Sequence, residues 1–164
     1  MLDDTNAKSM TIIVTKGTLD WAYPPFILAT TAAAMGIETT MFFTFYGLQL
    51  LKKDLDLKVS TLGNPAMEVP FGGMHFQMPN LIGAVPGVDR IVTNVMKGMI
   101  KKKGVASIQE LRDLALEADV KMIACQMTMD LFEYKREDMI DGPILGGAAS
   151  WVDAAAKSDI NLYI

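Results

Sequence analysis

The chain has 164 residues, of which 51% are hydrophobic and 21% are charged, and its formal net charge is −4 at pH 7. This composition excludes a disordered chain, and the length suits one domain with a buried core. The acidic balance argues against a nucleic acid as partner, because nucleic acid requires a clustered basic surface. The single cysteine excludes an internal disulfide and any zinc or iron–sulfur site built from the cysteines of one chain.

Apolar, β-branched runs alternate along the chain with amphipathic or small-residue segments. We expect residues 1–9 to form a flexible tail and residues 10–164 to form one domain. The alternation predicts a doubly wound α/β fold, in which a mostly parallel five-stranded sheet carries helices on both faces. The predicted strands are residues 10–15, 38–45, 120–124, 142–145 and 160–164. The predicted helices are residues 21–35, 46–53, 88–103, 107–118, 126–132 and 148–157.

Six of the seven prolines lie in two segments of the chain. Pro24 and Pro25 are expected in the first turn of their helix, where N–H groups lack helical partners anyway. Residues 54–86 hold eight glycines and prolines, so we expect a long loop that contains a single short helical turn. The centre of this loop, residues 71–79, is too apolar for a solvated linker. It could serve as a lid or as a flap at an interface.

The candidate chemical centre is Cys125, which stands where the predicted strand 120–124 ends and the helix 126–132 begins. Backbone N–H groups at a helix start favour negative charge, so a thiolate is stabilised there. Ligands of open α/β sheets bind at such strand–helix junctions. The polar residues Gln126 and Thr128 are difficult to place in a sealed core, although an inert buried cysteine is the alternative interpretation.

Other residues could complete a site around the thiol. His75 is the only histidine, and it could act on Cys125 as base or donor if its loop folds over the site; a purely structural role is the alternative. Gly17 follows the first strand and could line the same crevice, or form an ordinary tight turn. Met127 would lie beside the thiol together with its two polar neighbours. No spacing of metal ligands is present, so we expect neither a metal nor a cofactor.

A lone thiol limits the chemistry and suggests a cellular setting. Cys125 cannot run a dithiol cycle within one chain, but it can hold sulfur as a persulfide or form a mixed disulfide with a partner. An unpaired thiol suits a reducing cytoplasm, and the acidic start of the chain is unlike a secretory signal. The charge-free residues 21–37 are too short for a membrane span. The 13 methionines and the apolar loop predict a homo-oligomer.

Four segments resemble the DsrE/DsrF-like sulfur-carrier proteins, and most closely the single-chain branch labelled DsrE-like or peroxiredoxin-like. The most specific segment is ACQMTMDLF around Cys125, and the others are DMIDGPILGGAASWVDAAAKSDINLYI, IVTKGTLDWAYPPFILATTAAAMGIETTMFFTFYGLQLL and KKKGVASIQELRDLALEADVKMIAC. The resemblance covers nearly the whole chain. It implies a doubly wound α/β domain that assembles into homo-oligomers. It also implies that Cys125 carries persulfide or thiosulfonate sulfur in the cytoplasm, with small TusA-like sulfur carriers and rhodanese-type donors as partners.

Three functions are compatible with these observations. In the leading hypothesis the protein is a sulfur carrier or sulfurtransferase, in which Cys125 takes sulfane sulfur from a donor and passes it to an acceptor thiol. The alternative is a non-enzymatic oligomeric subunit that binds a small ligand or serves in assembly. A third possibility is a thiol peroxidase, which would form a sulfenic acid on Cys125 and need a partner thiol to reduce it.

Overall fold

The structure is a computed structural model that describes residues 7–64, 66, 68–71, 74–77 and 79–164. The chain divides into two compact units. We call the first the sheet unit; it consists of Met1–Gly17, Trp21–Leu55 and Ile108–Ile164. We call the second the hairpin unit; it consists of Thr18–Asp20 and Asp56–Ser107.

The predicted tail is only partly described. Residues 1–6 lie outside the described residues. Lys8 and Ser9 both donate their backbone N–H groups to the Asp159 carboxylate, and Ser9 is already part of the first strand. The prediction that residues 10–164 form one domain stays a prediction.

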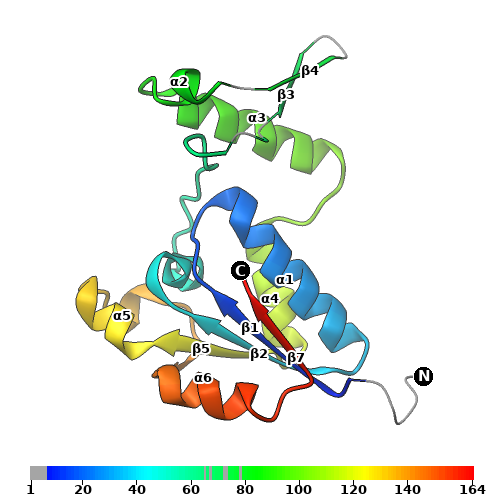
Figure 1. Cartoon of the computed structure of the whole chain (residues 1–164), viewed down its shortest axis with the longest axis vertical. Helices are drawn as coiled ribbons and strands as arrows, with labels where there is room; N and C mark the ends of the chain where they lie inside the picture. Colours follow the sequence, from blue (N-terminus) through cyan, green and yellow to red (C-terminus); the bar gives the residue numbers. More distant parts are fainter. Residues whose placement is uncertain (1–6, 65, 67, 72–73, 78) are drawn as a thin grey trace. The chain divides into compact units, whose positions relative to one another are not determined.

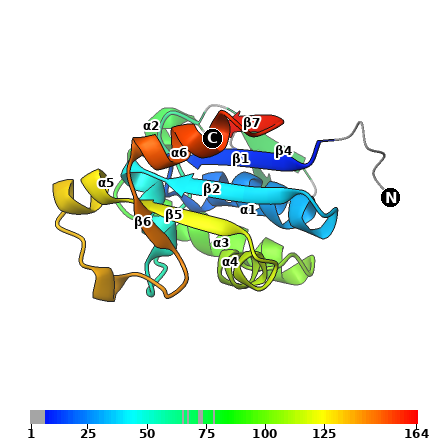
Figure 2. The same cartoon turned by 90° about the horizontal axis from the view of Figure 1, so that it is seen from below.

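The sheet unit is built on a five-stranded sheet with the order β6-β5-β2-β1-β7 (Figures 1 and 2). Every pair of neighbouring strands is parallel, as expected when each crossover contains a helix or a long loop. All five predicted strands are present, so the predicted α/β fold is confirmed. The strands are β1 (Ser9–Val14), β2 (Glu38–Phe43), β5 (Lys121–Cys125), β6 (Ile144–Gly146) and β7 (Ile160–Tyr163).

Helices cover both faces of this sheet, as the figures show, with α1 and α4 on one side and α6 on the other. Successive residues of β2 illustrate the two faces, because side chains alternate along a strand. Phe43 lies against Phe26 of α1, with ring centroids 5.9 Å apart. Phe42 belongs to a buried cluster against which Trp151 of α6 packs. The helices and 3₁₀ turns of this unit are α1 (Leu19–Ala34, whose first two residues belong to the hairpin unit), η1 (Phe45–Leu51), α4 (Ile108–Glu117), α5 (Gln126–Leu131), η2 (Arg136–Asp138) and α6 (Ala148–Ala155).

Helix α1 begins at Leu19, two residues before its predicted start. The Leu19 N–H donates to the Lys58 carbonyl at 2.8 Å, and the Asp20 carboxylate accepts from the Ser60 N–H at 2.9 Å. These bonds anchor the first turn. Pro24 and Pro25 therefore stand in the second turn, and the prediction that they occupy the first was wrong. The carbonyls one turn earlier lose their usual helical donors.

The segment after β2 forms the 3₁₀ helix η1 rather than an ordinary α-helix. Its last carbonyls are bonded by Arg112 of α4, which is 2% exposed. The Arg112 Nη1 donates to the carbonyls of Leu50 at 3.1 Å and Lys52 at 2.7 Å. A buried guanidinium thus satisfies acceptors that the short helix leaves free.

In the hairpin unit, the prediction of a long loop with one helical turn was wrong. The described residues include an antiparallel pair, β3 and β4, in which Pro70 lies opposite His75. Two short apolar runs separated by Gly72-Gly73 are a hairpin signal, which the density of glycine and proline concealed. Within the predicted flap at residues 71–79, positions 72, 73 and 78 lie outside the described residues. The elements of this unit are β3 (Glu68–Phe71), β4 (Met74–Gln77), α2 (Asn80–Gly83) and α3 (Val88–Lys102).

Candidate functional site

Cys125 is the last residue of β5 and the N-cap of α5, as the sequence predicts. Its backbone is extended, with φ −68° and ψ 111°, and it pairs with Gly146 of the edge strand β6. Gly146 has no room for a side chain, because a Cβ there would lie 2.7 Å from Ile123 and 3.1 Å from the Ser150 hydroxyl. The thiol therefore sits at the carboxyl end of the sheet, beside the start of α6.

The thiol is buried, with only 3% of Cys125 exposed. It belongs to a cluster with Phe42 and Ile123, against which Ile13 and Trp151 pack. Trp151 comes from α6, a helix with no buried residue of its own. The indole Nε1 of Trp151 is nevertheless buried and has no hydrogen-bond partner among the described residues. One side of the thiol is thus apolar and is covered by a weakly buried helix.

The other side of the thiol is polar and is formed by two neighbouring strand ends. Thr128, one turn into α5, is fully buried. Its Oγ1 accepts a hydrogen bond from the Phe45 N–H at 3.1 Å and lies 3.2 Å from the Thr44 Oγ1. Because the Thr128 oxygen already accepts a hydrogen bond from the Phe45 N–H, the Thr128 hydroxyl can donate its own proton to Thr44 or to the sulfur of Cys125.

These groups lower the pKa of the Cys125 thiol below its ordinary value of 9.0. Burial is the largest single influence and raises the pKa, because it disfavours the thiolate. Hydrogen-bond donation from Thr128 (hydroxyl and N–H), the Thr44 hydroxyl and the Met127 N–H together outweighs burial. The site therefore holds a larger thiolate fraction at neutral pH than an unperturbed cysteine would.

Gln126 and Met127 contribute less to the environment of the thiol than Thr128 does. The Gln126 amide donates to the Asp130 carboxylate at 2.8 Å on the exposed side of α5, so its side chain is occupied there. Met127 supplies its backbone N–H to the thiol, whereas its side chain is 59% exposed. The predicted roles of Gln126, Met127 and Thr128 in binding stay predictions.

The other two predicted site residues lie elsewhere. Gly17 lies against η1, where a Cβ would come within 2.3 Å of the Tyr46 carbonyl, so its contacts explain it as a point of close backbone approach. His75 lies on β4 of the hairpin unit, whereas Cys125 belongs to the sheet unit. The structure brings neither residue into a described contact with the thiol, and their functional roles stay predictions.

Sequence reasoning missed three contributors to the site: Thr44, Phe45 and Trp151. Thr44 directly follows β2, and β2 pairs with β5 so that Phe43 lies opposite Ala124. Thr44 lay inside the predicted strand 38–45, so it was not recognised as a polar residue at a strand end, where the carboxyl ends of parallel strands converge. The positive φ of Phe45, 47°, had no signal, since a large aromatic residue rarely adopts it.

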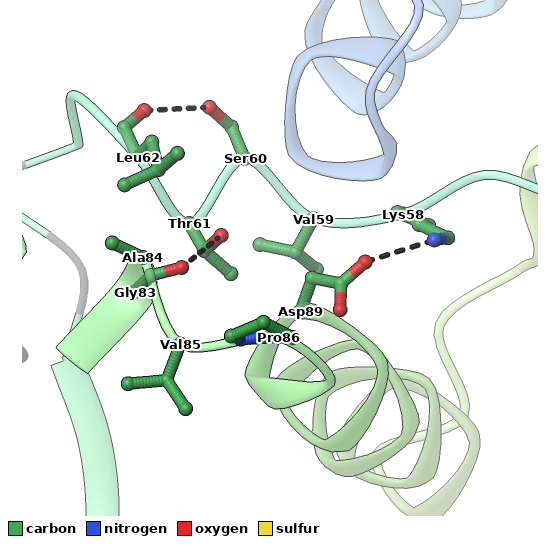
Figure 3. Close-up of a pocket in the computed structure, with 10 residues that line it drawn as sticks. All are labelled: Lys58, Val59, Ser60, Thr61, Leu62, Gly83, Ala84, Val85, Pro86 and Asp89. Atoms are coloured by element: carbon green, nitrogen blue, oxygen red, sulfur yellow. Dashed lines mark hydrogen bonds and ion pairs between the residues drawn. The ribbon is translucent and has the colours of Figure 1, made fainter.

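Apart from the thiol, the described residues offer few other candidate functional sites. No group of three or more potential metal ligands occurs among them. No helix in the described part of the chain is long and apolar enough to cross a bilayer. A groove of about 460 Å³ lies in the hairpin unit (Figure 3). Its polar side chains bond within the unit, as in the Lys58–Asp89 ion pair at 2.8 Å and the bond from Thr61 to the Gly83 carbonyl.

Comparison with known proteins gives matches along almost the entire chain. A family model described as the DsrE/DsrF/DrsH-like family matches residues 6–163. The sulfur carrier protein DsrE2 of Allochromatium vinosum is 58% identical over 157 residues, which are 96% of this chain and 98% of that protein. The uncharacterized protein YrkE of Bacillus subtilis is 30% identical over 158 residues, 96% of this chain and 97% of that one.

A solved structure shares the fold. The crystal structure of the ychN protein from E. coli superposes with a TM-score of 0.52, covering 96% of this chain and 99% of that chain. At 10% sequence identity this likeness concerns the fold alone.

Proposed function

This chain belongs to the DsrE/DsrF/DrsH-like family, which confirms the resemblance found in its sequence, and from that premise we propose that it is a sulfur carrier. It would hold sulfane sulfur on Cys125 and pass it to an acceptor thiol. The observation that carries the proposal is the set of donors from Thr128, Thr44 and Met127, which lowers the pKa of the only thiol in the chain. The name of the relative from Allochromatium vinosum supports the same function.

The transfer needs no redox cofactor. The Cys125 thiolate attacks the outer sulfur of a donor persulfide; a new S–S bond forms, the donor's own S–S bond breaks, and the donor leaves as a thiolate. The product is an anionic persulfide on Cys125. An acceptor thiolate then attacks the outer sulfur, which breaks the bond to Cys125 and returns it to the thiolate. The donors that lower the thiol pKa also favour the anionic persulfide and make Cys125 a good leaving group.

A buried thiol must be uncovered before it can react with a partner. The cover on its apolar side is Trp151, and α6, which carries it, has no buried residue. Elements with few buried contacts open locally at low cost. We therefore expect α6 to move when a partner docks, so that burial protects the persulfide from water and other thiols between transfers.

The surface around the site fits a protein partner. Large apolar side chains are exposed on α5, β6 and α6, although such residues are usually buried. We propose that this surface serves both a homo-oligomer and the docking of small sulfur-carrier or rhodanese-type proteins, in a reducing cytoplasm. The exposed side chains are Met127, Leu131, Ile144, Leu145 and Val152.

The test is the loading of the folded protein with sulfur. Intact-mass spectrometry after incubation with polysulfide or with a persulfidated carrier should show the gain of one sulfur atom, located on Cys125 and removed by dithiothreitol. The Cys125→Ser variant should gain none, because it has no other thiol.

Native and denatured samples must be compared. A thiol that remains unmodified in the folded protein with every donor, yet reacts after denaturation, would identify Cys125 as an inert core cysteine. That result would favour a ligand-binding or assembly subunit instead.

A further inference from the structure

We propose that the hairpin unit binds the surface of an anionic lipid bilayer through one face of α3 and the adjoining α2. The face consists of Ile91, Val95 and Met99, which we call the α3 ridge. These residues follow one another at intervals of four and therefore form one stripe along the helix. All three are exposed, Ile91 to 65%. This inference does not depend on the proposed function of Cys125.

The fold of the hairpin unit uses a different face of α3. Thr93 is buried, and its hydroxyl accepts the Val59 N–H at 2.9 Å. Asp89 pairs with Lys58 at 2.8 Å, which fastens the start of the helix to the same segment. These contacts orient α3, so the α3 ridge is apolar surface that the unit leaves uncovered.

The apolar surface continues beyond the helix itself. Leu81 and Ile82 of α2 are exposed, Leu81 to 84%. Val85, in the link between the two helices, is exposed as well and lines the groove in Figure 3. Helices α2 and α3 contact each other within the unit. Several large exposed side chains on two contacting helices favour a site of interaction, because exposed hydrophobic residues normally occur singly.

The charge of this segment is opposite to that of the rest of the chain. Residues 88–103 hold five of the 15 basic residues and one of the 19 acidic residues, a net charge of +4, whereas all other residues together carry −8. Lys97, Lys101, Lys102 and Lys103 are exposed and form no salt bridge with the described residues. An acidic protein therefore presents one basic segment, and this segment also carries the apolar ridge.

An anionic bilayer offers both interactions that this segment lacks. Its lipid headgroups attract exposed lysines, and its acyl boundary accepts apolar side chains from a helix that lies in the surface plane. A soluble acidic partner would need a matching apolar face beside its charges, whereas a bilayer presents both over its whole surface. The acidic remainder of this chain would be repelled by the same surface, so the contact would be confined to the hairpin unit.

Vesicle flotation of the full chain tests the proposal. We expect the protein to float with vesicles of phosphatidylglycerol and phosphatidylcholine, to remain unbound with phosphatidylcholine alone, and to dissociate as salt is raised. The triple variant K101Q/K102Q/K103Q should bind roughly a hundredfold more weakly, since each basic side chain near an anionic surface contributes about a factor of five. The ridge variant I91S/V95S/M99S should also lose binding, although it keeps every charge.

A matched control removes the same charge elsewhere. The variant K53Q/K121Q/K157Q lies in the sheet unit and should bind as the unaltered chain does. Circular dichroism should show folded variants, because all the altered side chains are exposed. C125S should bind vesicles normally. Equal binding to neutral and anionic vesicles, or binding to neither, would overturn the proposal. A vesicle-independent oligomer that dissociates in K101Q/K102Q/K103Q would also overturn it, by assigning the surface to a second copy of the chain.

Discussion

The neighbouring strands β2 and β5 end side by side but in different ways. β5 passes directly into a helix, with Cys125 extended at the junction. β2 ends at Phe43, and two residues later Phe45, the first residue of η1, takes a φ of 47°. For a residue other than glycine this conformation costs about 1–2 kcal/mol. In return it directs the Phe45 N–H onto Thr128 of the neighbouring strand–helix junction.

The difference shows that the lowered pKa of the Cys125 thiol depends on two segments distant in sequence. The helix start alone supplies the N–H groups of Met127 and Thr128. The end of β2 supplies the Thr44 hydroxyl and, through Phe45, holds the Thr128 hydroxyl. Substitutions at the end of β2 should therefore change the pKa of the Cys125 thiol.

The largest effect is expected from Thr128→Val. The substitution keeps the shape of the side chain but removes the acceptor of the Phe45 N–H and one donor to the thiol. We expect a loss of about 1–3 kcal/mol in the free energy of unfolding, because a polar partner is left unsatisfied. The pKa of Cys125 should rise, and alkylation of the thiol at neutral pH should slow. Denaturant titration and iodoacetamide kinetics measure the two effects.

A series of threonine-to-valine variants distinguishes an effect on the Cys125 thiol from a general loss of stability. Thr44→Val should raise the pKa of Cys125 by less than T128V does, since the Thr128 hydroxyl lowers this pKa more than the Thr44 hydroxyl does. Thr40→Val alters a buried threonine of the same strand that has no part in the site, and it should leave the kinetics unchanged. If T40V slowed alkylation as much as T128V, the hydroxyl network would not be the cause.

The lowered pKa of Cys125 also predicts how stability depends on pH. Between the lowered pKa in the folded state and the ordinary value of 9.0, the unfolded chain holds a proton on the thiol that the folded chain has released. The free energy of unfolding therefore increases as pH rises through that window, by at most about 1.4 kcal/mol per pH unit, and decreases as pH falls. C125S, measured in parallel, should lack this slope; an identical pH profile would show that the thiol is unperturbed.

The strand and helix that flank Cys125 were predicted well, because the local signals there agree. Around Cys125, an apolar strand, a helix start and a polar first turn follow one another within ten residues, and each survives in the structure. The hairpin of β3 and β4 was not predicted, because glycine and proline are typical of both loops and tight turns. Strand positions alone also could not tell that β2 pairs with β5, so the part played by Thr44 could not be inferred.

The backbone of Phe45 illustrates what no single-residue pattern reveals. Its φ of 47° stands at the first residue of η1, and the sequence FTFYG around it carries no glycine or asparagine at that position. Likewise, the role of Trp151 depends on where α6 crosses the sheet. Tertiary contacts, not local preference, determine both.

Phe45 allows a direct measurement of the strain at the end of β2. Phe45→Ala and Phe45→Gly both remove the ring contact with Phe132, and the two variants differ mainly in backbone freedom. We expect F45G to be more stable than F45A by about 1 kcal/mol, the reverse of the usual order, because glycine adopts positive φ without cost. Thermal and denaturant unfolding of the pair would reveal this. A more stable F45A would mean that the residue has an ordinary negative φ.

The smallest change in stability is expected for Trp151→Phe, which tests the apolar side of the thiol. Phenylalanine preserves an aromatic ring against the Cys125 cluster but removes an indole N–H that is buried without a partner among the described residues. The loss of an unsatisfied donor should leave the free energy of unfolding within about 0.5 kcal/mol of its original value, or slightly raise it. If this N–H serves the outer sulfur of a persulfide, W151F should load sulfur and then lose it severalfold faster to an acceptor thiol, while alkylation of the unloaded thiol is unchanged. Persulfide lifetimes that match those of the unaltered protein would show that Trp151 only covers the thiol, and that the donors at the ends of β2 and β5 suffice to hold the charge.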